Sequence, residues 1–115
     1  MEKQSFGKHV RISKRRDYLT VYQQGVRNDS RNFIVITCRN QSGFSRLGIT
    51  VSKKVGDAVR RNRIKRLLRE FFRLHKTQFS PSQDIVIIAK KDIPILTYQD
   101  VCKELESLFT KKSDA

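Results

Sequence analysis

The most charged stretch of the chain, VGDAVRRNRIKRLLREFFRLH (55–75), carries seven Lys or Arg side chains within fourteen positions. Cationic side chains at this density repel one another, so they destabilise a helix unless something compensates for them. Clusters of Lys and Arg are typical of nucleic-acid-binding surfaces. The segment therefore predicts a helix with one face packed on the protein and another face that binds a polyanion.

The residues of this segment separate into two faces on a helix that advances about 100° per residue. The apolar face, an arc of about 160°, comprises Ile64, Leu67, Leu68, Phe71, Phe72, Leu74 and, within the same arc, His75. The opposite face, an arc of about 100°, comprises Asn62, Lys65, Arg66, Arg69, Arg73 and Lys76. Arg60 and Arg61 project on the apolar side, but in the first turn, where long side chains can pass beyond the edge of a sheet.

A solvated surface helix is the ordinary alternative for such a charged face. Solvated faces usually mix the signs of charge, because Glu four residues from Lys or Arg adds a few tenths of a kcal/mol. Here Arg66, Arg69 and Arg73 have only Glu70 nearby, and residues 53–76 contain ten Lys or Arg against two acids. Polyanion binding is therefore favoured, and Asn62 adds an amide able to bond a phosphate or a base edge.

The residues just before this helix add two more cations and a turn. Lys53 and Lys54 follow a predicted strand, Gly56 permits the turn, and Asp57 is placed to cap the helix. The free backbone N–H groups of a helix N-terminus can receive phosphate. The glycine-rich Walker pattern is absent, however, so the sequence gives little support to nucleoside triphosphate binding.

Composition points to the same class of partner. The chain has 115 residues, a formal net charge of +14 and a pI of about 10.4, which favours nucleic acid or an anionic membrane surface. No run of about 18 apolar residues is present, so no transmembrane span is expected, and the N-terminus lacks the apolar core of a signal peptide. We expect a cytoplasmic protein in which Cys38 and Cys102 are buried free thiols.

Residues that could give the protein an active site of its own are scattered. The eleven carboxylates form no grouping with metal-ligand spacing, His9 and His75 are isolated, and neither cysteine has a metal-like neighbour. The sequence therefore predicts no catalytic residue and no metal site on the protein. It makes a self-sufficient nuclease the weaker hypothesis.

Hydrophobic patterning predicts one domain over residues 1–115, preceded by a partly ordered basic arm at 1–12. The expected helices are a first one capped by Ser13 and stopped at Gly25, the basic helix, and a last one that opens with Thr97 and Asp100 and buries Val101, Leu105, Leu108 and Phe109. The expected strands are 32–39, 45–52 and 84–90, with a short additional strand at 26–27, a hairpin loop at 40–44 and a loop at 77–82. This order indicates an α+β (α/β sandwich) fold around one sheet.

The run GITVSKKVGDAVRRNRIKRLLREFF (48–72) resembles the signature of the protein subunit of bacterial ribonuclease P, with Arg61-Asn62-Arg63 as its most specific core. Further matches are DYLTVYQQG (17–25), RNFIVIT (31–37), DIVIIAK (84–90) and LTYQDVCKELESLF (96–109). The resemblance implies a sandwich with a mostly antiparallel four-stranded sheet and about three helices, like one domain of a ribosomal small-subunit protein. It also implies a left-handed strand–helix–strand crossover, whereas general rules favour the right-handed form.

The resemblance further implies a small basic protein that assembles with a large catalytic RNA. The complex removes the 5′ leader of precursor tRNA by endonucleolytic hydrolysis, and the RNA supplies the active site and binds the catalytic Mg²⁺. Neither DNA nor a membrane is an expected partner. A ribosomal or general RNA-binding protein remains the alternative that composition alone does not exclude.

Two sets of site residues follow from the resemblance. Those implied to bind the catalytic RNA are Lys53, Lys54, Arg60, Arg61, Asn62, Arg63, Lys65, Arg66 and Arg69. Those implied to bind the precursor tRNA leader, in a cleft between the first helix and the sheet, are Tyr18, Tyr22, Ile36, Lys54 and Lys90. Aromatic rings can stack on bases of any sequence, although from the residues alone ordinary packing of Tyr18 and Tyr22 on the sheet is favoured. Relatives often carry an aromatic residue in place of Ile36.

Overall fold

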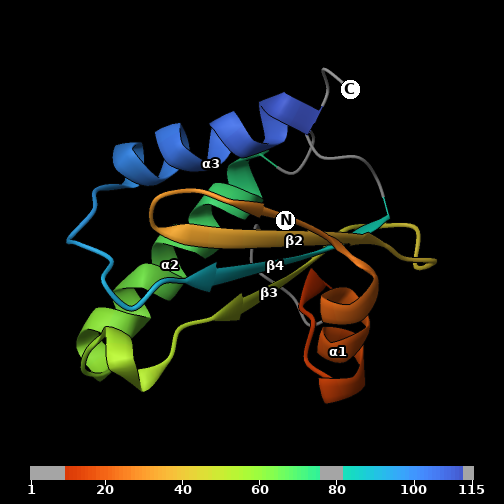
Figure 1. Ribbon diagram of the computed structural model, residues 1–115, viewed down its shortest axis with the longest axis horizontal. Coiled ribbons are helices and arrows are strands. Elements are labelled where there is room, and N and C mark those ends of the chain that lie inside the picture. The colour runs from red at the N-terminus through yellow and green to blue at the C-terminus, as the bar shows by residue number, and fades with distance from the viewer. Residues whose placement is uncertain (1–9, 76–81, 113–115) are drawn as a thin grey trace, which may run out of the picture.

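A computed structural model of the chain describes residues 10–75 and 82–112, with side chains described up to residue 108. Four strands form one mixed sheet: β1 (Val26–Asp29), β2 (Phe33–Arg39), β3 (Arg46–Thr50) and β4 (Gln83–Ala89). Its helices are α1 (Arg15–Gln24), α2 (Ala58–His75) and α3 (Tyr98–Lys112), and the 3₁₀ turn η2 (Lys53–Val55) precedes α2 (Figure 1). The predicted α+β class is confirmed.

The order of the strands in the sheet is β1-β2-β4-β3. The pairs β1–β2 and β2–β4 are antiparallel, and β3–β4 is parallel. The prediction of a hairpin at 40–44 is therefore wrong, since β4 lies between β2 and β3. A strand that is apolar on both faces is best buried at the centre of a sheet, and β4 has that pattern. The chain crosses from β3 through α2 to the parallel strand β4, as the resemblance implied. The left-handedness of this crossover stays a prediction.

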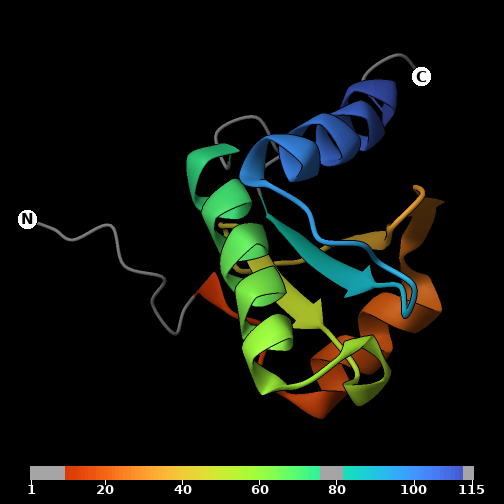
Figure 2. The same ribbon diagram turned by 90° about the vertical axis from the view of Figure 1, so that its left-hand side faces the viewer.

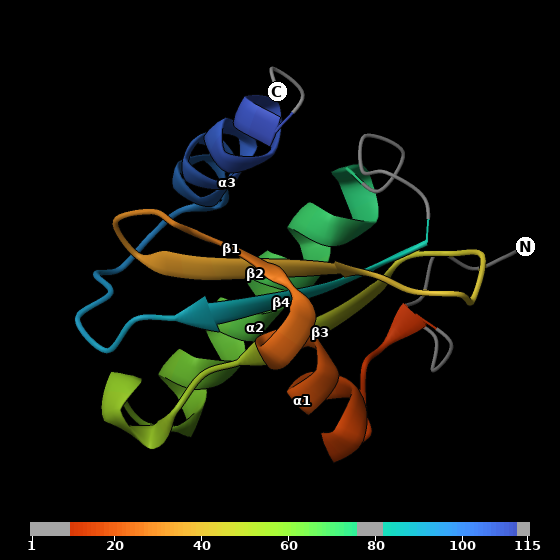
Figure 3. The same cartoon turned by 45° about the vertical axis from the view of Figure 1, so that its right-hand side comes forward.

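Helices cover both faces of the sheet. Figure 3 shows α1 in front of the strands and α2 behind them. Beneath α1, Val21 packs with Ile36 and Val86 in a small core. On the other face a larger core joins the sheet to α2 and α3, and its members include Phe33, Leu47, Leu68, Phe71, Phe72, Ile85, Ile87 and Leu105.

Helix ends follow the capping chemistry of the sequence in most places. Asp57 Oδ1 accepts a hydrogen bond from the Arg60 N–H at 2.9 Å, as an N-cap should. Thr97 and Asp100 form the predicted capping box, with reciprocal bonds of 2.9 and 3.1 Å. The predicted Ser13 cap is wrong: Lys14 is the N-cap of α1, and it makes no side-chain cap bond.

Gly25 ends α1 as predicted, and its N–H donates to Val21 O at 2.8 Å. Its backbone is extended rather than left-handed, so the need for glycine comes from space. A Cβ at Gly25 would lie 2.6 Å from the Cγ2 atom of Ile36. The close approach of α1 to β2 therefore depends on the missing side chain.

The buried stripes of α2 and α3 agree with the sequence except at one residue. Ile64, Leu68, Phe71 and Phe72 are buried, and Val101, Leu105 and Leu108 are buried on α3. Leu74 is 51% exposed, so the predicted apolar face is wrong at this residue. The Phe109 side chain lies outside the described residues.

Arg46 and Asp84 form an ion pair that the sequence did not reveal. Two guanidinium nitrogens of Arg46 donate to the two carboxylate oxygens of Asp84 at 2.8 and 2.7 Å. Asn40 donates to the same carboxylate at 2.7 Å, and Asp17 of α1 lies 3.5 Å from Arg46. The pair thus ties β3, β4 and the start of α1 together.

Some predictions concern residues outside the described ranges, namely His9 and most of the 1–12 arm, Lys76, and the loop at 77–82 except Ser82. Of the predicted arm, Arg11 forms a bridge with Leu47 and Ile12 is buried, so the described end of the arm lies against β3. None of the described helices is long and apolar enough to cross a membrane.

Candidate nucleic-acid interface

The outward face of α2 presents cations that have no acidic partner in the part of the chain that the structure describes. We call it the basic face, and it comprises Asn62, Lys65, Arg66 and Arg69. Among the described residues, no carboxylate forms an ion pair with these side chains, whereas Arg73 pairs with Glu70 at 2.7 Å. Figure 2 shows the whole length of α2 on one side of the molecule, with α3 near its C-terminal end. The charge of the basic face is therefore not neutralised within the described part of the protein.

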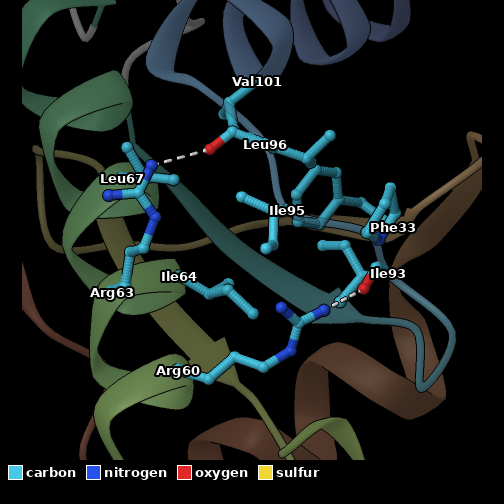
Figure 4. Close-up of a pocket in the computed structure, with 10 residues that line it drawn as sticks. Phe33, Arg60, Arg63, Ile64, Leu67, Ile93, Ile95, Leu96 and Val101 are labelled. Atoms are coloured by element: carbon cyan, nitrogen blue, oxygen red, sulfur yellow. Dashed lines mark hydrogen bonds between the residues drawn. The ribbon is translucent and has the colours of Figure 1, made fainter.

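The three arginines at the start of α2 are used differently, because each of them donates to a backbone carbonyl. Arg60 bonds Val55 O at 3.0 Å and also Ile93 O. Arg63 bonds Leu96 O at 3.0 Å (Figure 4). These bonds hold the segment between β4 and α3 against α2.

Arg61 makes the same kind of bond to a residue nearby in the chain, donating to Gly56 O at 3.1 Å. A guanidinium carries five N–H donors, so each of these arginines keeps donors for another partner. Arg63 is exposed, while Arg60 and Arg61 are half-buried. Of the three, Arg63 is thus the most accessible to RNA.

Arg60 and Arg63 border a cavity, and Arg63 also borders an open groove. A small apolar cavity of about 30 Å³ lies under Arg60 and Arg63 and is lined mainly by Ile64, Ile93 and Leu96 (Figure 4). A wider open groove of about 410 Å³ is lined by Arg63, Arg66, Leu67, Glu70 and Tyr98. The groove extends the basic face toward α3.

Lys53 and Lys54 are exposed in η2, directly before the turn into α2. Gly56 makes that turn with φ +155°, a value that L residues rarely adopt. The sequence predicted both the turn and its cations. The cations lie on a short turn rather than on the basic face itself.

On the other side of the sheet, Tyr18 and Tyr22 are neighbours on α1, with ring centroids 6.3 Å apart. Tyr18 is half-buried over Gly48, where an added Cβ would lie 2.8 Å from the ring. Burial raises the pKa of its phenol, Tyr22 adds to the rise, and a hydrogen bond with the Ile49 backbone opposes it. Tyr22 is 42% exposed, so it is the ring available for stacking.

The sheet-side residues implied for the leader are less accessible. Ile36 is 7% exposed beneath α1, so it cannot offer a surface to a base. Lys90 donates to Ser30 O at 2.8 Å and lies 3.8 Å from Asp29, which fixes it to the β1–β2 turn. Lys54 is exposed.

Ile34 and Ile88 are half-buried on the same face as Ile36 and pair directly across β2 and β4. Sequence reasoning did not single them out as site residues. The alternation along β2, which places Ile34 and Ile36 on one face, was the signal that could have found them. Of Ile34 and Ile36, the one that α1 covers is buried, and the alternation alone does not say which of them that is.

The structure also groups potential metal ligands. His75, Cys102 and Glu106 place one ligand atom each within 4.8 Å of the others, the only such grouping of three or more among the described residues. The expectation that neither cysteine has a metal-like neighbour is therefore corrected. It failed because His75 is distant from Cys102 in the sequence. Both cysteines are free and half-buried rather than fully buried.

A sandwich with tyrosines on one helix, and on another helix cations that have no acidic partner among the described residues, defines a small basic protein whose surface suits single-stranded and folded RNA. Residues 6–113 match the family model of ribonuclease P. The chain belongs to the family of bacterial ribonuclease P protein components.

Relatives support this assignment over nearly the whole chain. The ribonuclease P protein component of Syntrophus aciditrophicus is 54% identical over 112 residues, covering 97% of this chain and 94% of that protein. The component of Desulforapulum autotrophicum is 44% identical and covers 93% and 92%.

Solved structures agree. The RNase P protein of Staphylococcus aureus superimposes with a TM-score of 0.81 at 38% identity, over 90% of this chain and 94% of that one. The Thermotoga maritima protein gives 0.79 at 34% identity, over 88% and 96%. The chain is thus an RNA-binding subunit of a ribonucleoprotein that processes the 5′ end of tRNA, and the predicted family and fold are confirmed.

Proposed function

We propose that this protein binds the catalytic RNA of ribonuclease P through the basic face of α2, with help from Lys53, Lys54 and Arg63. The observation that carries the proposal is that Lys65, Arg66 and Arg69 lack an acidic partner among the described residues. Side chains that neutralise phosphates release condensed counterions, and this release dominates affinity for nucleic acid. Arg60 and Arg61 shape the same surface, since their carbonyl bonds fix the start of the helix.

The surface around α1 takes the 5′ leader of precursor tRNA in this proposal. Tyr22 supplies an exposed ring, and the Tyr18 ring lies beside it, tilted, with the centroids 6.3 Å apart. Ile34 and Ile88 replace Ile36 as the apolar surface on the sheet, because α1 covers Ile36. Stacking of this kind tolerates any base, as a leader of variable sequence requires. Lys54 and Lys90 are the candidates for contacts with the leader backbone.

The chemistry itself we assign to the RNA partner, which also holds the catalytic Mg²⁺. Several described carboxylates support this assignment because they are already engaged with other side chains, namely Asp29 with Arg27, Glu70 with Arg73, Asp84 with Arg46, and Glu104 with Asn32 and Ser30. Carboxylates used in this way are poor candidates for a two-metal hydrolytic site. The assembled enzyme would act in the cytoplasm.

Reconstitution tests the proposal. Cleavage of precursor tRNA by the catalytic RNA should be followed at low Mg²⁺ with and without the protein, which is first freed of co-purified RNA. The protein should increase the rate or the substrate affinity, and it should show no cleavage alone. Cleavage by RNA-free protein would overturn the assignment of chemistry to RNA. The absence of any gain would favour a general RNA-binding protein instead.

A further inference from the structure

The end of α2 and the middle of α3 bring together a histidine, a thiol and a carboxylate. Cys102 and Glu106 are four residues apart on α3, which places them one turn apart on the same face. His75 is the last residue of α2. The three ligand atoms lie within 4.8 Å of one another, and Figure 2 shows the two helices side by side at this point.

The hydrogen bonds of His75 leave one ring nitrogen facing a negative group. Its Nδ1 lies 2.9 Å from Phe71 O, and its Nε2 lies 3.0 Å from a carboxylate oxygen of Glu106. Both partners are acceptors, whereas a neutral imidazole carries a single N–H. When Nδ1 carries the proton and donates it to the carbonyl, the Nε2 lone pair is free to bind a metal ion shared with the Glu106 carboxylate.

Tyr98 lies next to Cys102, and its buried hydroxyl has no hydrogen-bond partner among the described residues. Burial raises the pKa of this phenol, and the Cys102 thiol adds to the rise. A Cys102 thiolate would accept the Tyr98 O–H, in the manner of the outer hydrogen bonds that orient metal ligands. The bond of His75 Nδ1 to Phe71 O is of the same kind.

We propose that His75 Nε2, Cys102 Sγ and a Glu106 oxygen bind one Zn²⁺ ion that links the end of α2 to α3. Nitrogen, sulfur and oxygen ligands suit Zn²⁺, and three protein ligands leave its fourth position to water. Zn–ligand bonds of about 2.0–2.3 Å place ligand atoms about 3.5 Å apart. The site therefore closes by a movement of about 1 Å, which the half-exposed Glu106 side chain can make.

The site would also be neutral, since one thiolate and one carboxylate balance the ion. Because the Glu106 carboxylate is already counted in the net charge of +14 and the Cys102 thiol releases its proton, binding adds a single positive charge to the chain. Because binding requires both helices to be in place, the ion stabilises the folded state by an amount that grows with the logarithm of its concentration relative to the Kd. It would fix the basic helix against α3 before RNA binds.

Metal titration of the RNA-free, reduced, full-length protein tests the site. Co²⁺ should bind with one equivalent and give a thiolate-to-metal absorption band that Zn²⁺ then removes. Zn²⁺ at about 100 times its Kd should raise Tm by on the order of 10 °C. Cys102→Ser should abolish the band, and Glu106→Gln should weaken binding at least about tenfold.

Cys38→Ser is the matched control, because Cys38 is the other free, half-buried thiol and lies on the opposite face of the sheet. It should leave the Co²⁺ band and the Zn²⁺ shift unchanged. The proposal is overturned if millimolar Co²⁺ gives no thiolate band in the wild type. It is equally overturned if the band survives Cys102→Ser or is lost in Cys38→Ser. Urea unfolding of each variant confirms that the change is not one of folding.

Discussion

The two tyrosines of α1 show how one residue type serves two purposes in one turn. Tyr18 is half-buried over Gly48, so the packing favoured by the sequence alone describes it well. Tyr22 is 42% exposed, so stacking remains open to it. The sequence pattern places both tyrosines on the same face of the helix. Their different burial comes from the packing of α1 on the sheet, which the pattern does not give.

Tyr22→Ala should therefore weaken binding of leader-bearing precursor tRNA while leaving mature tRNA unchanged. Loss of one stacked ring costs about 1–3 kcal/mol, which corresponds to an affinity loss of about 5- to 150-fold. Leu19→Ala is the matched control, since Leu19 is 41% exposed on the same helix. Dissociation constants of the holoenzyme for the two tRNAs measure the effect. An equal loss for both tRNAs would refute the leader assignment.

Gly48→Ala tests the close contact between β3 and Tyr18. The new Cβ would lie 2.8 Å from the Tyr18 ring, so the ring must move, at a cost of about 1–3 kcal/mol in the free energy of unfolding. In a Tyr18→Ala background the same change should cost much less, because the clash is absent. Urea unfolding of the four proteins measures the coupling. Additive effects would contradict the contact.

At the level of elements, local chemistry predicted most of what was found. Asp57, Gly25 and the Thr97–Asp100 box mark helix ends through hydrogen bonds that neighbouring residues make. Apolar periodicity located the strands and the buried side of α2. Predictions failed where the answer depended on distant segments, as in the hairpin at 40–44, which required knowledge that β4 enters the sheet between β2 and β3.

For the candidate site too, the sequence predicted the local features and not the contacts between distant segments. Charge density and the resemblance located the basic helix, but they gave no sign that Arg60 and Arg63 bond the carbonyls of Ile93 and Leu96. Those bonds join segments some 33 residues apart. The burial of Ile36 and the pairing of His75 with Glu106 are likewise products of tertiary packing.

The capping box of α3 makes a prediction about pH. Hydrogen bonds from Thr97, first from its backbone N–H, hold the pKa of Asp100 below its usual range. The folded state then binds fewer protons than the unfolded state, so this stabilisation is complete above about pH 4 and is lost as the pH falls through the lower, folded pKa.

Asp100→Asn should thus destabilise the protein at pH 6 and much less at pH 2.5. Urea unfolding of wild type and variant at both pH values measures the difference. A difference in the free energy of unfolding that is the same at both pH values would show that the ionised carboxylate contributes nothing special.

For the whole molecule, the pair of Arg46 and Asp84 is the clearest polar link between layers. Arg46→Met should lower the free energy of unfolding by about 3 kcal/mol, because it leaves a buried carboxylate without its partner. Arg27→Met is the control, since its pair with Asp29 is exposed and should matter little. Urea unfolding at neutral pH compares them. Equal effects would contradict a structural role specific to Arg46.

The basic face of α2 has no acidic partner within the described part of the protein, and we propose that it is kept free in order to bind RNA phosphates. The most direct test is the dependence of the catalytic-RNA affinity on salt, measured for Arg66→Gln, Arg69→Gln and the charge-conserving double variant Glu70→Gln with Arg73→Gln. Each single change should weaken binding and reduce the slope of log affinity against log salt by about one, while the double variant should keep the wild-type slope. Unchanged slopes for Arg66→Gln and Arg69→Gln would show that these side chains do not contact RNA phosphates.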